Sequence, residues 1–174
     1  MWDLDLRDLA AGIGNLTAEF GAALAQAGAV SFETQDHASG AELALDGDYV
    51  TSLTCLWKPC DDKARRCWND REMATEFGAE GIAILLVHRY CRFQVVERSW
   101  KGTGFDYWLG DEDSMPFQSK ARLEVSGIGS GTRADVQRRV RIKTRQTDPS
   151  DSTGLPAYVV VVEFGSPTCT FVKK

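Results

Sequence analysis

Residues 104–147 decide the fold, and they read GFDYWLGDEDSMPFQSKARLEVSGIGSGTRADVQRRVRIKTRQT. The first segment, GFDYWLG, is short, apolar and aromatic, which predicts a strand. The acidic, turn-forming segment DEDSMPFQS predicts a loop, and ARLEVSGI alternates as a strand does. A glycine-rich entry then leads into a helical body, with Ser130 or Thr132 as its N-cap. The stretch therefore predicts strand, loop, strand and helix in that order.

Downstream of this stretch, the segment DPSDSTGLP (148–156) breaks the helix. The next segment, AYVVVVEFG (157–165), is almost continuously apolar and β-branched. Such a run is typical of a central strand that is buried on both faces. The final residues, TCTFVKK (168–174), predict a short edge strand.

Upstream, residues 1–30 predict one or two amphipathic helices, and residues 41–57 predict two strands around an Asp-Gly turn at 46–47. Residues 60–81 are helical in composition, with the best part beginning near Asn69 and ending at Gly81. Residues 82–100 predict one bent strand or two strands. From Asn69 onward the expected order is helix, strand, strand, strand, helix, strand.

Composition places the chain among globular proteins. It has 174 residues, of which 43% are hydrophobic and 26% charged, and its net charge is -5. We therefore expect one domain over residues 1–174, with no polyanion-binding tail. The apolar run IAILLV is too short to span a bilayer, and the N-terminus lacks the pattern of a signal peptide. Five cysteines without a CxxC pair favour reduced, buried thiols in the cytoplasm over a zinc site.

Two carboxylates lie in segments predicted as neighbouring strands, Asp106 in GFDYWLG and Glu124 in ARLEVSGI. Antiparallel neighbours can bring two such groups onto one face, a few ångströms apart. Two carboxylates that close repel each other unless a cation lies between them, and oxygen ligands suit Mg²⁺ or Mn²⁺. The alternative is that both are structural and pair with Arg98, Arg122 or Lys101.

Lys143 lies where a core residue would be expected. On a helix of 3.6 residues per turn, it shares one stripe with Val136 and Val140. A buried ammonium needs a carboxylate or phosphate partner, so Lys143 could act beside the two acids. The alternative is a lysine whose stem packs on the helix edge while its amine reaches water.

The same helix is strongly basic, although the chain as a whole is acidic. Contact with a phosphate backbone is the natural use of such a patch, and the alternative is an ordinary solvated helix face. The candidate nucleic-acid-binding residues are Lys101, Arg138, Arg139, Arg141 and Arg145.

At these residues the chain resembles the PD-(D/E)xK, or restriction-endonuclease-like, nuclease superfamily. The glycine-rich GTGFD that ends at Asp106 is similar to the approach to the first acid of that family, and LEVS is similar to the second half-motif through Glu124. The family's third-strand lysine is replaced here by Ser126. The resemblance covers about residues 69–164.

The resemblance implies an α/β fold with an α-β-β-β-α-β core at 69–174, preceded by a helix and β-hairpin extension at 1–68. It also implies Mg²⁺ or Mn²⁺ at Asp106 and Glu124. Because the lysine moves to the following helix in some members, Lys143 or Gln146 would take its part. An acid on the first core helix often assists, for which Glu72 and Glu76 are the candidates.

The resulting expectation is a metal-dependent phosphodiester hydrolase. It would act on nucleic acid, with DNA favoured over RNA, and could be a subunit of a prokaryotic defence complex. The acidic total charge suggests a protein partner or a homo-oligomer that helps to grip the substrate, and no membrane is expected. The alternative is a non-catalytic interaction subunit that keeps the nuclease fold, for which the absence of the third-strand lysine and the tryptophans argue.

Overall fold

The computed structural model of the protein describes residues 2–111 and 119–174. Its centre is a mixed sheet of eight strands in the order β1-β3-β2-β8-β7-β6-β5-β4. The strands are β1 (Trp2–Asp5), β2 (Ala41–Gly47), β3 (Thr51–Leu56), β4 (Phe93–Arg98), β5 (Tyr107–Asp111), β6 (Ala121–Ile128), β7 (Ala157–Glu163) and β8 (Thr168–Lys173). The helices are η1 (Leu6–Ala11), α1 (Ala18–Thr34), α2 (Asp62–Cys67), α3 (Arg71–Cys91), α4 (Arg133–Gln146) and η3 (Asp148–Thr153).

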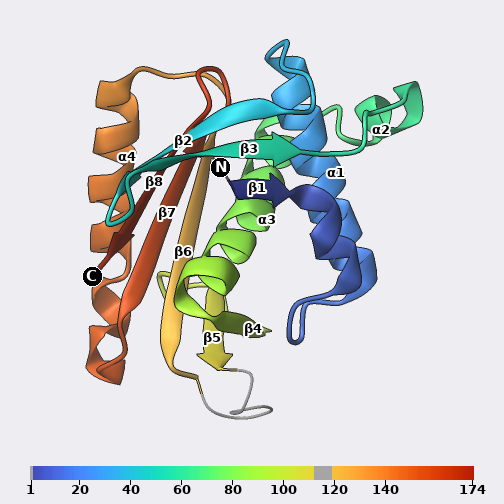
Figure 1. Ribbon diagram of the computed structural model, residues 1–174. Coiled ribbons are helices and arrows are strands. Elements are labelled where there is room, and N and C mark those ends of the chain that lie inside the picture. Colours follow the sequence, from blue (N-terminus) through green and yellow to red (C-terminus); the bar gives the residue numbers. More distant parts are fainter. Residues whose placement is uncertain (1, 112–118) are drawn as a thin grey trace.

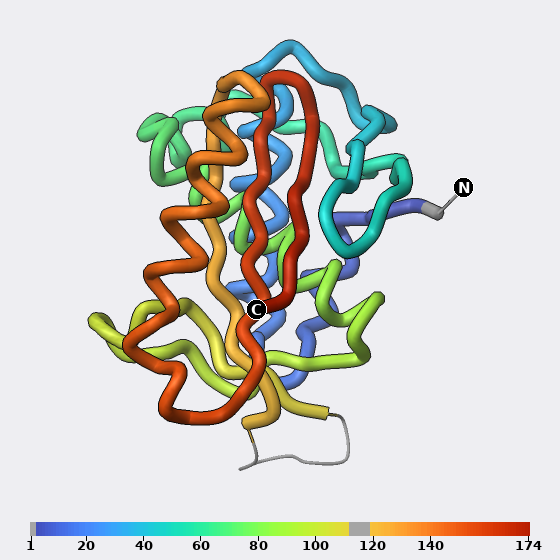
Figure 2. Tube along the Cα trace, turned by 90° about the vertical axis from the view of Figure 1, so that its left-hand side faces the viewer, coloured from blue at the N-terminus to red at the C-terminus, as the bar shows by residue number. Residues whose placement is uncertain are grey.

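The helices cover the two faces of the sheet. Helix α3 packs on α1 and on β6, and α4 packs on β6 and β7 from the other side (Figure 1). Figure 2 shows α4 running beside the β7–β8 hairpin for most of its length. Because β7 is covered on both faces, all seven of its residues are buried, as the run of valines predicts. The α/β class expected from the sequence is therefore confirmed.

The order of elements from α3 onward is the one expected from the sequence: α3, β4, β5, β6, α4, β7. Strands β4 and β5 pair antiparallel, as do β5 and β6, whereas β6 and β7 are parallel because α4 connects them. Helix α4 begins after Thr132, whose side chain and Asp135 form a capping box. The hairpin expected around Asp46-Gly47 is also present, as β2 and β3. The predicted loop DEDSMPFQS lies mostly outside the described residues.

Three predictions of local structure are wrong. The apolar run that begins at Ile82 is not strand material, because α3 continues through Gly81 to Cys91 and only residues 93–98 form a strand. A short apolar run fits a buried helix as well as a strand, and α3 is buried between α1 and the sheet. The close approach of the two helices is possible because glycines meet there: a Cβ on Gly78 would lie 2.7 Å from the Cα of Gly28.

The other two corrections concern the ends of the chain. Strand β8 is central, because it pairs antiparallel with β7 and in parallel with β2. Residues 2–5 do not begin a helix but form β1, which pairs in parallel with β3. The strands of residues 1–68 and of residues 69–174 thus belong to a single sheet. Among the described residues, no helix has the length and apolar character needed to cross a bilayer.

Candidate active site between β5, β6 and α4

Asp106 lies at the entrance to β5 and is fixed there by its backbone. Its amide donates to the carbonyl oxygen of Leu123 at 2.8 Å, and its carbonyl oxygen accepts from the amide of Ser99 at 2.7 Å. Its side chain reaches over the next strand, where Oδ2 accepts a hydrogen bond from the amide of Val125 at 2.8 Å. The carboxylate is therefore held over β6 beside Glu124.

Glu124 is buried on β6, with only 1% of its side chain exposed. Its Oε1 accepts a hydrogen bond from Nζ of Lys143 at 2.6 Å. Its Oε2 is also buried, and in the part of the chain that the structure describes this oxygen has no hydrogen-bond partner. An unpartnered buried carboxylate oxygen is costly, so this oxygen needs either a proton shared with the adjacent Asp106 carboxylate or a bound cation.

Burial raises the pKa values of both acids, and repulsion by Asp106 adds to the rise at Glu124. Burial, followed by the adjacent Asp106 carboxylate, raises the pKa of Glu124 to about 8 despite the opposing effect of Lys143. Burial also raises the pKa of Asp106, and this rise is opposed by the amide of Val125 and by the charge of Lys143. The two carboxylates thus form an interacting pair that resists carrying two negative charges without a cation.

Helix α4 supplies two cations to this pair of strands. Lys143 reaches Glu124, and Nη1 of Arg139 donates to Oγ of Ser126 at 2.7 Å. Arg139 and Lys143 are four helix residues apart, which is about 6 Å, and their partners Ser126 and Glu124 are two strand residues apart, which is about 6.6 Å. The two contacts therefore match in spacing. The inner stripe of α4 therefore presents Lys143 to the buried Glu124 and Arg139 to Ser126.

A second cluster of polar side chains, on the side of α3, lies near Asp106. Glu80 is buried and pairs with Arg98, whose Nη2 lies 2.7 Å from Oε1 of the glutamate. The hydroxyl of Tyr107 donates to Oε2 of Glu80 and accepts from Nη1 of Arg98. Burial raises the pKa of Glu80, Arg98 and Tyr107 oppose the rise, and Asp106 adds to it. The cluster places a third acid close enough to Asp106 to influence its charge.

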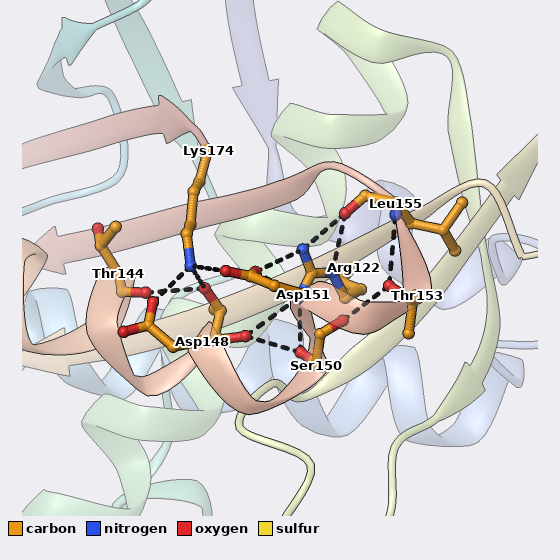
Figure 3. A network of polar contacts seen from close by, with 9 residues as sticks. Arg122, Thr144, Asp148, Ser150, Asp151, Thr153, Leu155 and Lys174 are labelled. Carbon is orange, nitrogen blue, oxygen red and sulfur yellow. Dashed lines mark hydrogen bonds and ion pairs between the residues drawn. The ribbon is translucent and has the colours of Figure 1, made fainter.

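The two arginines and the lysine of the structural alternative do not pair with the two acids, although the charge of Arg98 helps to oppose the rise in the pKa of Asp106. Arg98 pairs with Glu80, and Lys101 is exposed. Arg122 is buried just beyond the C-terminal end of α4, where it donates to the carbonyl oxygens of Thr147 and Leu155 and to the side chains of Ser150 and Asp151 (Figure 3). Within the described residues, none of these three cations forms an ion pair with Asp106 or Glu124.

The remaining candidates lie away from the carboxylate pair or face solvent. Gln146 is exposed at the last position of α4. Glu72 and Glu76 are exposed near the start of α3, where both line a pocket of about 280 Å³ with Arg139. The other basic residues proposed for nucleic-acid contact, Lys101, Arg138, Arg141 and Arg145, are all exposed.

Sequence reasoning missed Glu80 and the inward course of Arg139. Glu80 follows Glu76 by four residues, so it lies one turn further along α3. It was overlooked because the helix was expected to end at Gly81, which would have placed Glu80 at its frayed end. Extending the helix through IAILLV would have shown Glu80 on a buried face.

The described residues provide few ligands for a metal ion. Among the described residues, no group of three or more His, Cys, Asp or Glu side chains is arranged to bind a metal ion. The site therefore offers two carboxylates to a cation, and any further ligands would come from the backbone, water or substrate.

No family model matches the sequence, and neither a curated protein nor a solved structure matches the chain.

Proposed function

We propose that this protein is a metal-dependent phosphodiester hydrolase of the PD-(D/E)xK type, with Asp106 and Glu124 as ligands of Mg²⁺ or Mn²⁺. The observation that carries the proposal is the unpartnered, buried Oε2 of Glu124 beside the Asp106 carboxylate. A divalent cation would satisfy that oxygen and offset the repulsion by Asp106 that adds to the raised pKa of Glu124. The arrangement of α3, β4, β5, β6, α4 and β7 supports the same reading, because the family resemblance implies this order of elements.

Each side chain has a distinct part in the proposed reaction. When bound, the metal ion would polarise the phosphate and lower the pKa of a water molecule. Asp106, held by the amide of Val125, and Glu124 would keep their orientation without rearrangement. Lys143 would orient the attacking water and stabilise the negative charge that develops on the phosphate.

Arg139 would replace the family's third-strand lysine as a contact to a non-bridging phosphate oxygen. Its guanidinium is already held at Ser126, two residues beyond Glu124 on β6. A planar guanidinium suits bidentate contact with phosphate, whereas Lys143 is engaged by Glu124. The exposed arginines of α4 would bind the substrate backbone further from the reacting bond.

A non-catalytic interaction subunit is the second candidate. One observation favours it: Lys143 already neutralises one charge of the pair, and only two carboxylates of the described chain meet there. In that case the trio would be a buried ion pair that fixes α4 on the sheet. Preference for DNA over RNA, a place in a prokaryotic defence complex and a protein partner or homo-oligomer are further proposals, which rest on the resemblance and on the acidic net charge of -5.

The test is cleavage of plasmid, linear DNA and RNA by the full chain in Mg²⁺ or Mn²⁺. We expect cleavage to require the metal and to be lost in Asp106→Asn and Glu124→Gln. Glu42→Gln is the matched control, because Glu42 is an exposed acid on β2, away from β5 and β6, and its change should leave cleavage intact. Calorimetry should show metal binding to the wild type and to the control, but not to the Asp106 and Glu124 variants. Absence of both cleavage and metal binding would favour the interaction subunit.

A further inference from the structure

Trp100 is the most exposed large hydrophobic side chain in the described part of the structure, with 83% of its surface accessible. It lies in the loop between β4 and β5, six residues before Asp106. In the described chain its indole ring has no aromatic, cation–π or hydrogen-bonding partner. A tryptophan exposed to this extent offers the face of an indole ring to a ligand.

The loop that carries Trp100 is tightly built. The carbonyl oxygen of Trp100 accepts from the hydroxyl of Thr103 at 2.9 Å, and that hydroxyl also contacts the hydroxyl of Ser99. Ser99 in turn donates its amide to the carbonyl of Asp106, which closes the loop at its base. Trp100 takes part in these contacts through its backbone and not through its indole ring. The ring therefore faces solvent, while the backbone that carries it is held in place.

The loop is also attached to the end of α4. Gly104 has a φ of +83°, and a Cβ at this position would lie 2.0 Å from the carbonyl oxygen of Gln146. Figure 2 shows the loop, in yellow-green, projecting beside the C-terminal half of α4. The loop that carries Trp100 therefore adjoins the C-terminal end of the basic helix and the strand entrance that holds Asp106.

We propose that Trp100 is a stacking platform for an unpaired nucleobase, so that the site takes single-stranded nucleic acid or an unpaired strand end. This inference rests on the proposed function and names the form of its substrate. Bases within a duplex are covered by their neighbours, whereas an unpaired base offers a whole face to an indole. Lys101 is exposed next to Trp100, and Arg141 and Arg145 are exposed on the adjoining half of α4. These cations can contact the phosphates that flank such a base.

A protein partner is the other kind of occupant that an exposed tryptophan could serve. The surroundings favour the nucleobase, because the exposed residue next to Trp100 is the cation Lys101 and the loop directly precedes the candidate catalytic acid. Hot-spot tryptophans in protein interfaces are instead found near the centre of largely apolar, desolvated patches.

The experiment measures binding by fluorescence anisotropy in EDTA, so that no cleavage occurs. Labelled single-stranded DNA and RNA of one sequence, and the blunt DNA duplex, are titrated with wild type, Trp100→Ala and Trp100→Phe. Stacking on one base is worth about 1–3 kcal/mol, so Trp100→Ala should weaken single-strand binding about 5- to 150-fold and leave duplex binding unchanged. Trp100→Phe should retain most of the affinity.

Two controls give the experiment its specificity. Val50→Ala alters another highly exposed apolar side chain, at 81%, on the β2–β3 turn and should leave binding unchanged. An abasic nucleotide moved along the strand should weaken wild-type binding at one register, and this penalty should vanish in Trp100→Ala. Equal loss on single strand and duplex, or no loss, would overturn the inference.

The outcome also separates this inference from the proposed hydrolase. If wild type cleaves with dependence on Asp106 while Trp100→Ala binds as wild type does, only the stacking role is refuted. If single-strand binding depends on Trp100 but neither cleavage nor metal binding is found, the stacking role is supported and the hydrolase is refuted. If the wild type binds no nucleic acid at all, both are refuted.

Discussion

Replacing Glu124 by glutamine should stabilise the protein at high pH in the absence of metal, which is an unusual result for a buried polar residue. The glutamine mimics the protonated acid: its carbonyl oxygen can accept from Lys143, and its amide can donate to the neighbouring Asp106 carboxylate. The substitution therefore removes the repulsion within the pair and leaves the packing of β6 against α4 in place. It also supplies Asp106 with a hydrogen-bond donor.

The expected magnitude follows from the pKa of Glu124. The folded value of about 8 lies above the ordinary value of 4.5, so the native state holds a proton that the unfolded state has lost between these pH values. Stability contributed by this proton is present below pH 4.5 and is lost as the pH rises through 8. A shift of about 3.5 units corresponds to about 5 kcal/mol, since each unit is worth about 1.4 kcal/mol. Because the charge is shared with Asp106, we expect Glu124→Gln to gain about 2–4 kcal/mol at pH 9.

The assay is urea unfolding followed by circular dichroism at pH 5 and pH 9 in EDTA. Glu163→Gln is the matched control, because Glu163 is equally buried on the neighbouring strand β7 but accepts hydrogen bonds from the amides of Gly131, Gly165 and Ser166. This control should lose about 1–3 kcal/mol at both pH values, because a neutral amide cannot accept from all of these donors as a carboxylate does.

The reasoning would be refuted if Glu124→Gln were no more stable than wild type at pH 9, or if its gain were equally large at pH 5. Adding Mg²⁺ at pH 9 provides an independent readout of the proposed metal site. Binding to the native state should raise the stability of the wild type and leave Glu124→Gln nearly unchanged. An equal rise in both proteins would place the bound ion elsewhere.

Three further predictions concern the supports of the site, and urea unfolding measures each of them. Gly104→Ala should cost about 3 kcal/mol or more, because its Cβ would collide with a carbonyl of the last turn of α4. Gly102→Ala, at a φ of +100° but in open space, should cost only about 1 kcal/mol. Equal losses would contradict the docking of this loop on α4. Tyr107→Phe should cost about 1–3 kcal/mol, because it removes a donor from buried Glu80, and a neutral result would show that water replaces the hydroxyl. Arg122→Met should cost about 2–4 kcal/mol without abolishing metal binding, since this cation holds the segment after α4 and not the carboxylate pair; loss of metal binding would contradict that separation.

Much of the fold could be predicted because the relevant signals are local. The alternation in residues 121–128, the capping residue Thr132 and the valines of residues 159–162 each specify their element through neighbouring side chains. The apolar run of residues 82–87 could not be assigned in this way, because its neighbours in space, α1 and the sheet, are distant in sequence. The place of β8 in the middle of the sheet depends on pairing with β2, more than a hundred residues away.

The same distinction between local patterns and contacts distant in sequence applies to the candidate site. The sequence by itself determined which chemical groups are available, two carboxylates on neighbouring strands and a lysine on the inner stripe of the following helix, because strand and helix periodicities are local properties. Only the tertiary structure decided how those groups meet: Lys143 on one oxygen of Glu124, the other oxygen left without a partner, and Arg139 beside Ser126. The depth to which a charge is buried, and therefore its pKa and its need for a cation, is set by the packing of α4 on the sheet, which no local pattern encodes.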